Sequence, residues 1–174
     1  MRVGIGYDSH RFAPPGDHRR LILGGVEIPH GEGLLGHSDA DAVAHAFTDA
    51  LLGAAGLGDI GRLFPDTDAR WANADSLKLL NQAYLTIVEQ GFQFVQADLT
   101  VIAEQPKLAP YLEQMADKLA AAIVAAPSTI SVKAKTNEGM GWIGRGEGIA
   151  VMAVALLAEP PAPRLSSGVV GVSL

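Results

Sequence analysis

The sequence predicts one domain of the α/β (α+β) class: a mixed four-stranded sheet with helices on one face, plus an N-terminal β-hairpin. Three observations predict it. The 174 residues fit a single domain, the apolar fraction of 48% is sufficient for a core, and strand-like and helix-like segments alternate without a long internal repeat. We assign residues 1–158 to this domain and residues 159–174, which are rich in Pro, Ser and Gly, to a tail.

The chain begins with a strand and a hairpin. Residues 3–7 have the pattern of a short strand. The apolar segments 21–23 and 26–28 flank Gly24-Gly25, which is a two-residue turn signal, so we expect them to pair as a hairpin.

An amphipathic helix follows. Apolar residues recur every three or four positions from Val43 to Ala54, which is the helical period. Ser38, followed three residues later by Asp41, resembles a capping box at the start of this helix, and the glycines of residues 56–58 are expected to end it.

The rest of the domain alternates between helices and strands. Pro65 and several aspartates predict a polar loop at residues 59–70. Apolar spacing then predicts five further elements: a helix at 75–90, a strand at 92–103, a helix that begins at Pro106 and ends before Pro127, and strands at 129–136 and 148–157.

Composition restricts the function classes. Because the chain has no cysteine, a metal ion would have to be held by His, Asp or Glu. The net charge of −6 argues against a nucleic-acid partner, whose binding needs clustered Lys and Arg. The sequence shows neither a secretion signal nor an apolar run of about 18 residues, so we expect a cytoplasmic protein with no membrane partner.

Asp8, His10 and His45 are candidate metal ligands. Asp8 and His10 lie two residues apart at the end of a strand and therefore point to the same face, while His45 belongs to the first helix. Such a three-ligand site leaves one position open and suits zinc. Asp41 and Asp49 lie four residues on either side of His45, and Asp49 is a candidate partner for a metal-bound imidazole. The alternative interpretation is a core histidine beside a turn aspartate.

Other polar residues are candidates for substrate contacts. His37 and Ser38 lie where exposed backbone amides favour anions, and helix capping is the alternative. In the polar loop, Asp59 and Asp66 have side chains that accept hydrogen bonds from substrate hydroxyls or cap turns.

A glycine-rich segment follows the strand at 129–136. Lys135, Thr136 and Glu138 precede it, and Arg145 lies among its glycines. Glycines allow backbone amides to approach a phosphate, and Glu138 is a suitable ligand for magnesium. A purely structural turn is the alternative, because the P-loop spacing is absent.

Five sequence blocks occur together: GYDSHRF (6–12), LGGVEIP (23–29), GLLGHSDADAVAHAFTDALLGAAGLGDIGRLFPDTD (33–68), AEQPKL (103–108) and KTNEGMGWIGRGEGIA (135–150). In this order they resemble the 2-C-methyl-D-erythritol 2,4-cyclodiphosphate synthase family of the non-mevalonate isoprenoid pathway. Where many members have a threonine, this chain has Lys135, which we expect to replace the threonine's phosphate contact with an ammonium group.

The resemblance implies a phosphorus-oxygen lyase. Such an enzyme cyclises 4-diphosphocytidyl-2-C-methyl-D-erythritol 2-phosphate, a small cytidine diphosphate substrate, by metal-assisted intramolecular phosphoryl transfer and releases CMP. It implies one Zn²⁺ per subunit on Asp8, His10 and His45, and Mg²⁺ or Mn²⁺ on Glu138 with the substrate diphosphate. It also implies a homotrimer with active sites between subunits.

The resemblance further implies catalytic contacts from Thr136 and Glu138 as well as from the zinc ligands. Arg145 is also implied to lie near an isoprenoid-like ligand on the trimer axis. The full set of implied substrate-binding residues is His37, Ser38, Asp59, Gly61, Asp66, Ala103, Pro106, Lys107, Leu108, Lys135, Thr136 and Arg145.

Two other functions are compatible with the residues. A zinc-dependent hydrolase of a phosphorylated small molecule would activate water and use Asp41 or Asp49 as the general base. A binding module with a structural zinc would need a fourth protein ligand, and the sequence offers three clear ones.

Overall fold

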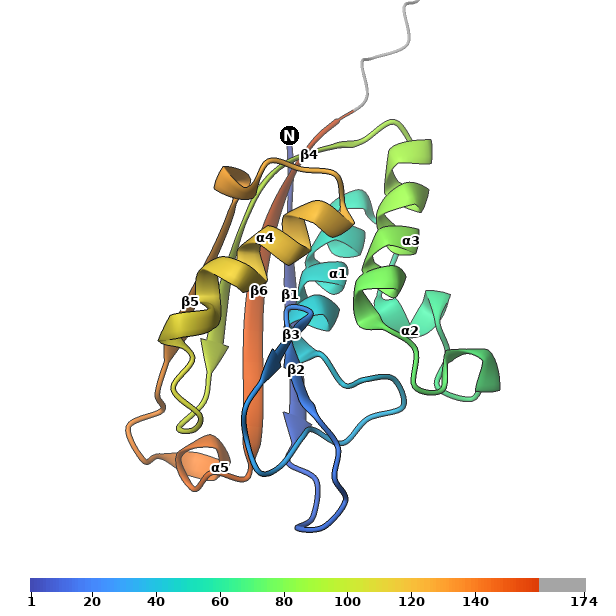
Figure 1. Cartoon of the computed structure of the whole chain (residues 1–174). Helices are drawn as coiled ribbons and strands as arrows, with labels where there is room; N and C mark the ends of the chain where they lie inside the picture. Colours follow the sequence, from blue (N-terminus) through green and yellow to red (C-terminus); the bar gives the residue numbers. More distant parts are fainter. Residues whose placement is uncertain (160–174) are drawn as a thin grey trace, which may run out of the picture.

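A four-stranded sheet carries the helices on one face, as the sequence predicts (Figure 1). The computed structural model describes residues 1–159, so the predicted tail beyond Glu159 lies outside the described residues and its boundary stays a prediction. The strands, in the order β1-β6-β4-β5, are β1 (Arg2–Arg11), β6 (Gly148–Ala158), β4 (Gln93–Ile102) and β5 (Ile130–Lys135). β4 and β5 are parallel, whereas β6 is antiparallel to β1 and β4, so the sheet is mixed as expected.

The predicted hairpin is confirmed. β2 (Leu21–Leu23) pairs with β3 (Val26–Ile28) in a separate two-stranded sheet. Gly24 and Gly25 both have positive φ angles, 55° and 71°, which glycine adopts without a steric penalty.

Five α-helices and three short 3₁₀ helices accompany the strands within residues 1–159. The α-helices are α1 (Ala42–Ala55), α2 (Ile60–Leu63), α3 (Ser76–Glu89), α4 (Leu112–Ala122) and α5 (Gly141–Gly144). The 3₁₀ helices are η1 (Ala69–Trp71), η2 (Ala109–Tyr111) and η3 (Pro127–Thr129). The short helix α5 lies in the glycine-rich segment, where the sequence pattern indicated only turns. No helix in this part of the chain has the length and apolar character needed to span a membrane.

The start of α1 differs from the prediction. Asp41, rather than Ser38, is the N-cap, and its carboxylate accepts hydrogen bonds from the amides of Val43 and Ala44. Ser38 precedes a turn in which Ala40 has a positive φ of 59°, so helical geometry cannot begin there. The predicted end is correct, because Gly56 forms a left-handed C-cap.

The third predicted helix begins later than expected. Residues 103–108 form an irregular segment after β4, followed by η2 and then by α4 at Leu112. Pro110 lies in η2 and has no amide hydrogen, so the regular hydrogen bonds of an α-helix begin only beyond it.

The core lies between the sheet and its helices. Its largest buried side chains come from the hairpin, the loop before α1, the covered face of the sheet and helices α1, α3 and α4: Leu21, Leu23, Ile28, Leu34, Leu99, Phe47, Leu51, Leu52, Leu80, Ile87, Met115 and Leu119.

Two glycines of β1 bring α1 against the sheet. A Cβ atom added to Gly6 would lie 1.9 Å from the carbonyl oxygen of Ala46, and one added to Gly4 would lie 2.0 Å from that of Ala50. No side chain fits at either position. This close approach brings the first turn of α1 next to the end of β1.

Within residues 1–159, no helix covers the opposite face of the sheet (Figure 1). Val3, Ile5 and Tyr7 alternate with the covered residues of β1 and are exposed, and Met152 and Val154 of β6 lie beside them. The result is an exposed apolar surface on two neighbouring strands, which we call the outer apolar face.

Candidate active site

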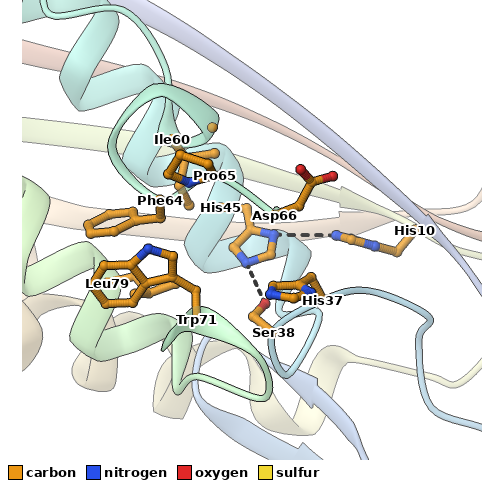
Figure 2. Close-up of a pocket in the computed structure, with 11 residues that line it drawn as sticks. His10, His37, Ser38, His45, Ile60, Phe64, Pro65, Asp66, Trp71 and Leu79 are labelled. Carbon is orange, nitrogen blue, oxygen red and sulfur yellow. Dashed lines mark hydrogen bonds between the residues drawn. The ribbon is translucent and has the colours of Figure 1, made fainter. Parts of the chain in front are cut away.

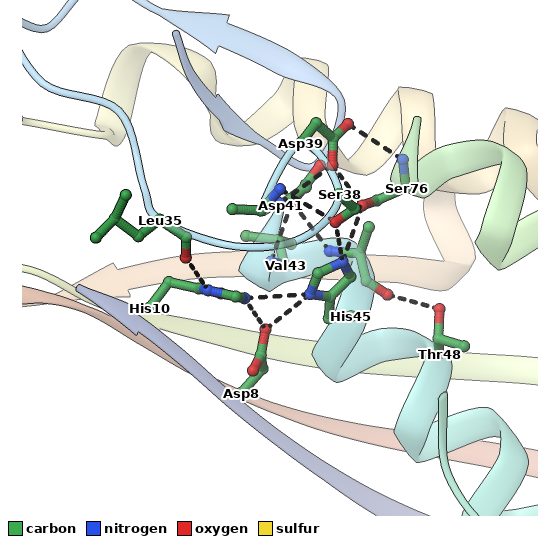
Figure 3. Close-up of polar contacts among 12 residues, drawn as sticks. Asp8, His10, Leu35, Ser38, Asp39, Asp41, Val43, His45, Thr48 and Ser76 are labelled. Atoms are coloured by element: carbon green, nitrogen blue, oxygen red, sulfur yellow. Dashed lines mark hydrogen bonds and ion pairs between the residues drawn. The ribbon is translucent and has the colours of Figure 1, made fainter. Parts of the chain in front are cut away.

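Asp8, His10 and His45 converge where β1 ends against α1 (Figure 3). Strand alternation directs Asp8 and His10 to the covered face, while His45 lies in the first turn of α1. Their side chains are 24%, 18% and 13% exposed, so the group is partly buried but reachable from solvent.

The three side chains bring one polar atom each into a small triangle. Oδ2 of Asp8 lies 3.0 Å from Nε2 of His10 and 3.0 Å from Nδ1 of His45, and the two nitrogens are 3.3 Å apart. Tetrahedral zinc with bonds of about 2.0–2.1 Å separates its ligand atoms by roughly 3.3 Å. The triangle therefore has the size of one face of a zinc coordination shell.

The outer nitrogens of both imidazoles are engaged elsewhere. Nδ1 of His10 donates to the carbonyl oxygen of Leu35 at 2.6 Å, because a carbonyl can only accept. Nε2 of His45 lies 2.9 Å from the hydroxyl of Ser76 and 3.1 Å from that of Ser38. In the neutral ring of His10 this bond leaves Nε2 with a lone pair that faces the carboxylate of Asp8, an arrangement that a cation stabilises.

Electrostatics favour an ionised Asp8. Burial alone would raise its pKa, but hydrogen bonds with His10 and His45 lower it well below the usual range. Burial lowers the pKa of His10, yet its hydrogen bond to Asp8 and the charge of Asp8 outweigh this, so the net shift is upward. Within residues 1–159 these are the three residues grouped closely enough to hold a metal ion together.

A cavity of about 440 Å³ opens beside the two histidines (Figure 2). Its lining residues are His10, His37, Ser38, His45, Ile60, Gly61, Phe64, Pro65, Asp66, Trp71 and Leu79. One end of the cavity therefore carries two of the candidate metal ligands, His10 and His45, and the other end is largely apolar. A metal ion held by three protein ligands would have its open coordination position available to a ligand in this space.

Sequence reasoning missed the apolar wall of this cavity. Phe64 and Trp71 pack edge to face with their ring centres 5.0 Å apart, and Ile60, Pro65 and Leu79 complete the wall. These residues come from α2 and the two residues after it, from η1 and from α3. The sequence pattern of residues 59–71 is dominated by aspartates and turn residues, so it predicted a polar loop rather than an apolar wall.

The predicted substrate residues of the polar loop separate into two groups. Gly61 and Asp66 line the cavity with His37 and Ser38, as a substrate role requires. Asp59 instead caps α2 by accepting a hydrogen bond from the amide of Arg62 at 2.9 Å.

Asp49 does not orient an imidazole, contrary to the sequence interpretation. Its carboxylate accepts the amide of Ile60 at 2.7 Å, and the partners of both imidazoles are the groups described above. Asp41 is completely buried and accepts hydrogen bonds from four backbone amides, those of Gly24, Gly25, Val43 and Ala44. Neither carboxylate lines the cavity, so neither is placed to act as the general base that the hydrolase alternative assigned to it.

A second polar cluster forms where β4 and β5 end. The amide of Ala103 donates to the carbonyl oxygen of Lys135 at 2.9 Å, which joins the AEQPKL and KTNEG segments. Thr136 donates its hydroxyl to Glu138 at 2.8 Å. Glu104, which the sequence analysis did not select, accepts the amides of Asn137 and Gly139 through one carboxylate oxygen.

The remaining members of this cluster differ in exposure. Ala103 and Leu108 are buried and Pro106 is partly buried, whereas Lys107, Lys135, Thr136 and Glu138 are exposed. Arg145 lies beyond α5 and pairs with Glu147 at 2.6 Å.

The two clusters lie at opposite edges of the sheet. Asp8 and His10 belong to β1, one edge strand, and the second cluster follows β5, the other edge strand. The fold of one chain therefore holds the candidate metal ligands and Glu138 apart, with β6 and β4 between them.

Comparison with known proteins identifies the family. The family model described as the YgbB family matches residues 1–158. The chain belongs to the YgbB family.

Relatives of this YgbB chain include proteins of two lengths. It is 55% identical over 159 residues to 2-C-methyl-D-erythritol 2,4-cyclodiphosphate synthase of Nitrosococcus oceani, a match that covers 91% of this chain and 99% of the relative. It is 56% identical over 157 residues to the bifunctional enzyme IspD/IspF of Anaeromyxobacter sp. strain Fw109-5, where the match covers 90% of this chain and 40% of the relative. The chain thus spans about two fifths of the bifunctional relative. These matches confirm the resemblance inferred from the five sequence blocks.

A solved structure extends the comparison to this YgbB fold. A 2C-methyl-D-erythritol-2,4-cyclodiphosphate synthase described as a bound form with CDP superposes with a TM-score of 0.80 at 41% identity. The match covers 90% of this chain and 100% of that one. The mixed sheet and its helical layer are therefore shared with a cyclodiphosphate synthase.

Proposed function

We propose that the protein converts 4-diphosphocytidyl-2-C-methyl-D-erythritol 2-phosphate to 2-C-methyl-D-erythritol 2,4-cyclodiphosphate and CMP. The observation that carries the proposal is the convergence of Asp8, His10 and His45 at one end of the cavity, in a chain 55% identical to a cyclodiphosphate synthase along nearly its whole length. The 2-phosphate oxygen would bond to the phosphorus next to methylerythritol, and the bridging oxygen would leave with CMP.

The donor sets match two different cations. Asp8, His10 and His45 would hold zinc, since two nitrogens and one carboxylate in a tetrahedral arrangement suit that ion. Glu138 is an exposed carboxylate and would hold Mg²⁺ or Mn²⁺, which take few protein ligands and bind substrate phosphates with the rest. Bound there, the two cations would neutralise charge on the attacking and the transferred phosphate groups.

The protein residues would bind and orient the substrate. This reaction needs two anionic groups held close and in line, and it needs no nucleophile from the protein. Ser38 and Asp66 line the cavity and would contact the methylerythritol phosphate moiety. The exposed ammonium of Lys135 and the hydroxyl of Thr136 would contact the diphosphate from the second cluster.

The second cluster would hold the cytidine end. Ala103, Pro106, Lys107 and Leu108 form the segment that the resemblance assigns to this role, and a solved relative is described in a form bound to CDP. Since the substrate is a charged nucleotide derivative, we place the reaction in the cytoplasm.

We further propose a homotrimer in which each active site uses both clusters from neighbouring subunits. The location of the clusters on opposite edge strands supports this, because one chain keeps them apart. The outer apolar face supports it too, because Ile5, Tyr7 and Met152 would be buried by association. Sedimentation equilibrium of the wild type should give the mass of three chains, and a monomer would exclude shared sites.

The decisive experiment follows the phosphorus atoms. The metal-free protein is supplied with Zn²⁺, Mg²⁺ and the cytidylated substrate, and the products are observed by phosphorus NMR. CMP with a cyclic diphosphate is expected. Linear products would support the hydrolase, and no product with intact metal binding would support a binding module. The His45→Ala variant should form no product and lose zinc.

A further inference from the structure

We propose that Ser76, held by Asp39, is a positioning residue for His45 that keeps its Nδ1 atom unprotonated and directed at the metal site. The inference rests on the metal site of the proposed function and names two residues on which that site depends. Figure 3 shows the connected side chains, which run from Asp39 through Ser76 to the imidazole of His45 and on to Asp8.

Ser76 is held rigidly by Asp39. It is the first residue of α3 and is 1% exposed. One carboxylate oxygen of Asp39 accepts the hydroxyl of Ser76, and the other accepts its amide at 3.1 Å. The amide of Asp39 in turn donates to the carbonyl oxygen of Ala74 at 3.1 Å. Hydrogen bonds thus connect the loop before α1 with the start of α3, and each of the two segments donates to the other.

The number of available protons determines the tautomer. An ionised carboxylate only accepts hydrogen bonds, so the single hydroxyl proton of Ser76 goes to Asp39. The oxygen of Ser76 then has only lone pairs left for His45, whose Nε2 lies 2.9 Å away and must donate. In a neutral imidazole this leaves Nδ1 with a lone pair, 3.0 Å from Oδ2 of Asp8.

The two serines beside His45 have different tasks. Ser38 accepts the amide of Ala40 at 3.2 Å and lies 3.1 Å from Nε2 of His45, but its side chain lines the cavity. Its proton is not committed to a carboxylate, and its acceptors are the hydroxyl oxygen of Ser76, 3.3 Å away, or a ligand phosphate in the cavity. Ser76 does not line the cavity and supports the imidazole from behind.

A structural role for Ser76 can be separated from a positioning role. Ser76→Ala removes the hydroxyl but keeps the hydrogen bond from the backbone amide of residue 76 to Asp39, so the start of α3 remains attached. Thr48→Val is the matched control. It removes another fully buried hydroxyl, one that donates to Ala44 at 2.7 Å within α1 and contacts no candidate metal ligand.

The first test titrates the metal-free wild type and both variants with Co²⁺, whose visible bands report coordination geometry. Ser76→Ala should bind Co²⁺ about 10–100-fold more weakly and with changed bands, which is the usual effect of removing the partner of a ligating histidine. Thr48→Val should bind as the wild type does, and Ser76→Thr should restore affinity. Equal affinities of Ser76→Ala and Thr48→Val would overturn the proposal.

The second test needs no variant. Nitrogen-15 NMR of the metal-free wild type at a pH where His45 is neutral should show its ring protonated at Nε2, with a slowly exchanging proton. Protonation at Nδ1 would overturn the proposal. The result is independent of metal loading, whereas failure of the wild type to bind either Co²⁺ or Zn²⁺ would refute the metal site of the proposed function instead.

Discussion

The carbonyl oxygen of Leu35 lies 2.6 Å from Nδ1 of His10 and determines which nitrogen of that ring faces Asp8. Because Nδ1 donates its proton to this carbonyl, Nε2 carries the lone pair in the neutral ring and is the atom that a metal would bind. A proton competes for the same lone pair. The negative charge of Asp8 favours the binding of both the proton and the metal ion at this nitrogen.

This competition predicts how metal affinity depends on pH. The net pKa of His10 is raised above 6.5, so protonation begins to displace the metal at a pH above that value. Below it, affinity should fall about tenfold per pH unit for each proton displaced. Isothermal titration with Zn²⁺ across this range measures the effect. A constant affinity through pH 6 would contradict the assignment of His10, whereas His37→Ala should leave the profile unchanged.

The same pKa shift predicts the stability of the metal-free protein. A histidine whose folded pKa is raised contributes stability that is fully present below the unfolded value of 6.5 and is lost as the pH rises through the folded pKa. Urea unfolding should therefore show a contribution from His10 that His10→Asn removes at pH 6 and barely changes well above the folded pKa. An equal loss at both pH values would show that packing, rather than charge, dominates.

Gly6 predicts a steric test of how α1 is placed. Gly6→Ala would bring a methyl group to 1.9 Å from the carbonyl oxygen of Ala46, the residue after His45 in α1. The helix must therefore move away from β1. We expect a loss of about 2 kcal/mol or more in unfolding free energy together with weaker metal binding. Gly53→Ala is the control. Its added Cβ lies 3.8 Å from Ile5, in an exposed helical position, and should stabilise by about 0.5–1 kcal/mol.

Asp41 predicts a large effect from a residue outside the cavity. Its carboxylate accepts four backbone amides, two from the turn of the hairpin and two from the start of α1. Asp41→Ala would leave several of these donors buried without a partner, and each costs about 1–3 kcal/mol. Asp75→Ala, which removes the N-cap of α3 and one exposed hydrogen bond, should cost about 1 kcal/mol. Thermal unfolding measures the loss of stability in both variants. Similar losses would contradict the view that buried amides left without an acceptor cost more than an exposed one.

The sequence predicted most of the elements and brought forward the three candidate metal ligands because their signals are local. A two-residue spacing on a strand and a helical histidine identify Asp8, His10 and His45, and the Gly-Gly pair identifies the hairpin. The roles of Asp39 and Ser76 could not be predicted, because these residues are 37 positions apart and meet only through the packing of α3 beside α1. Asp49 was misassigned because helical spacing places it near His45 but does not show the competing amide of Ile60.

Glu104 predicts an effect confined to the second cluster. Its carboxylate holds the amides of Asn137 and Gly139 on either side of Glu138, a residue with a left-handed φ of 52° that β-carbon sterics disfavour. Glu104→Ala should loosen this turn, so turnover should need a higher Mg²⁺ concentration for half-maximal rate while Co²⁺ affinity at the histidines stays the same. Asp98→Ala is the control, because it breaks an exposed ion pair with Lys133 on the same two strands. If Glu104→Ala changes Co²⁺ affinity but not the Mg²⁺ requirement, Glu104 does not position Glu138.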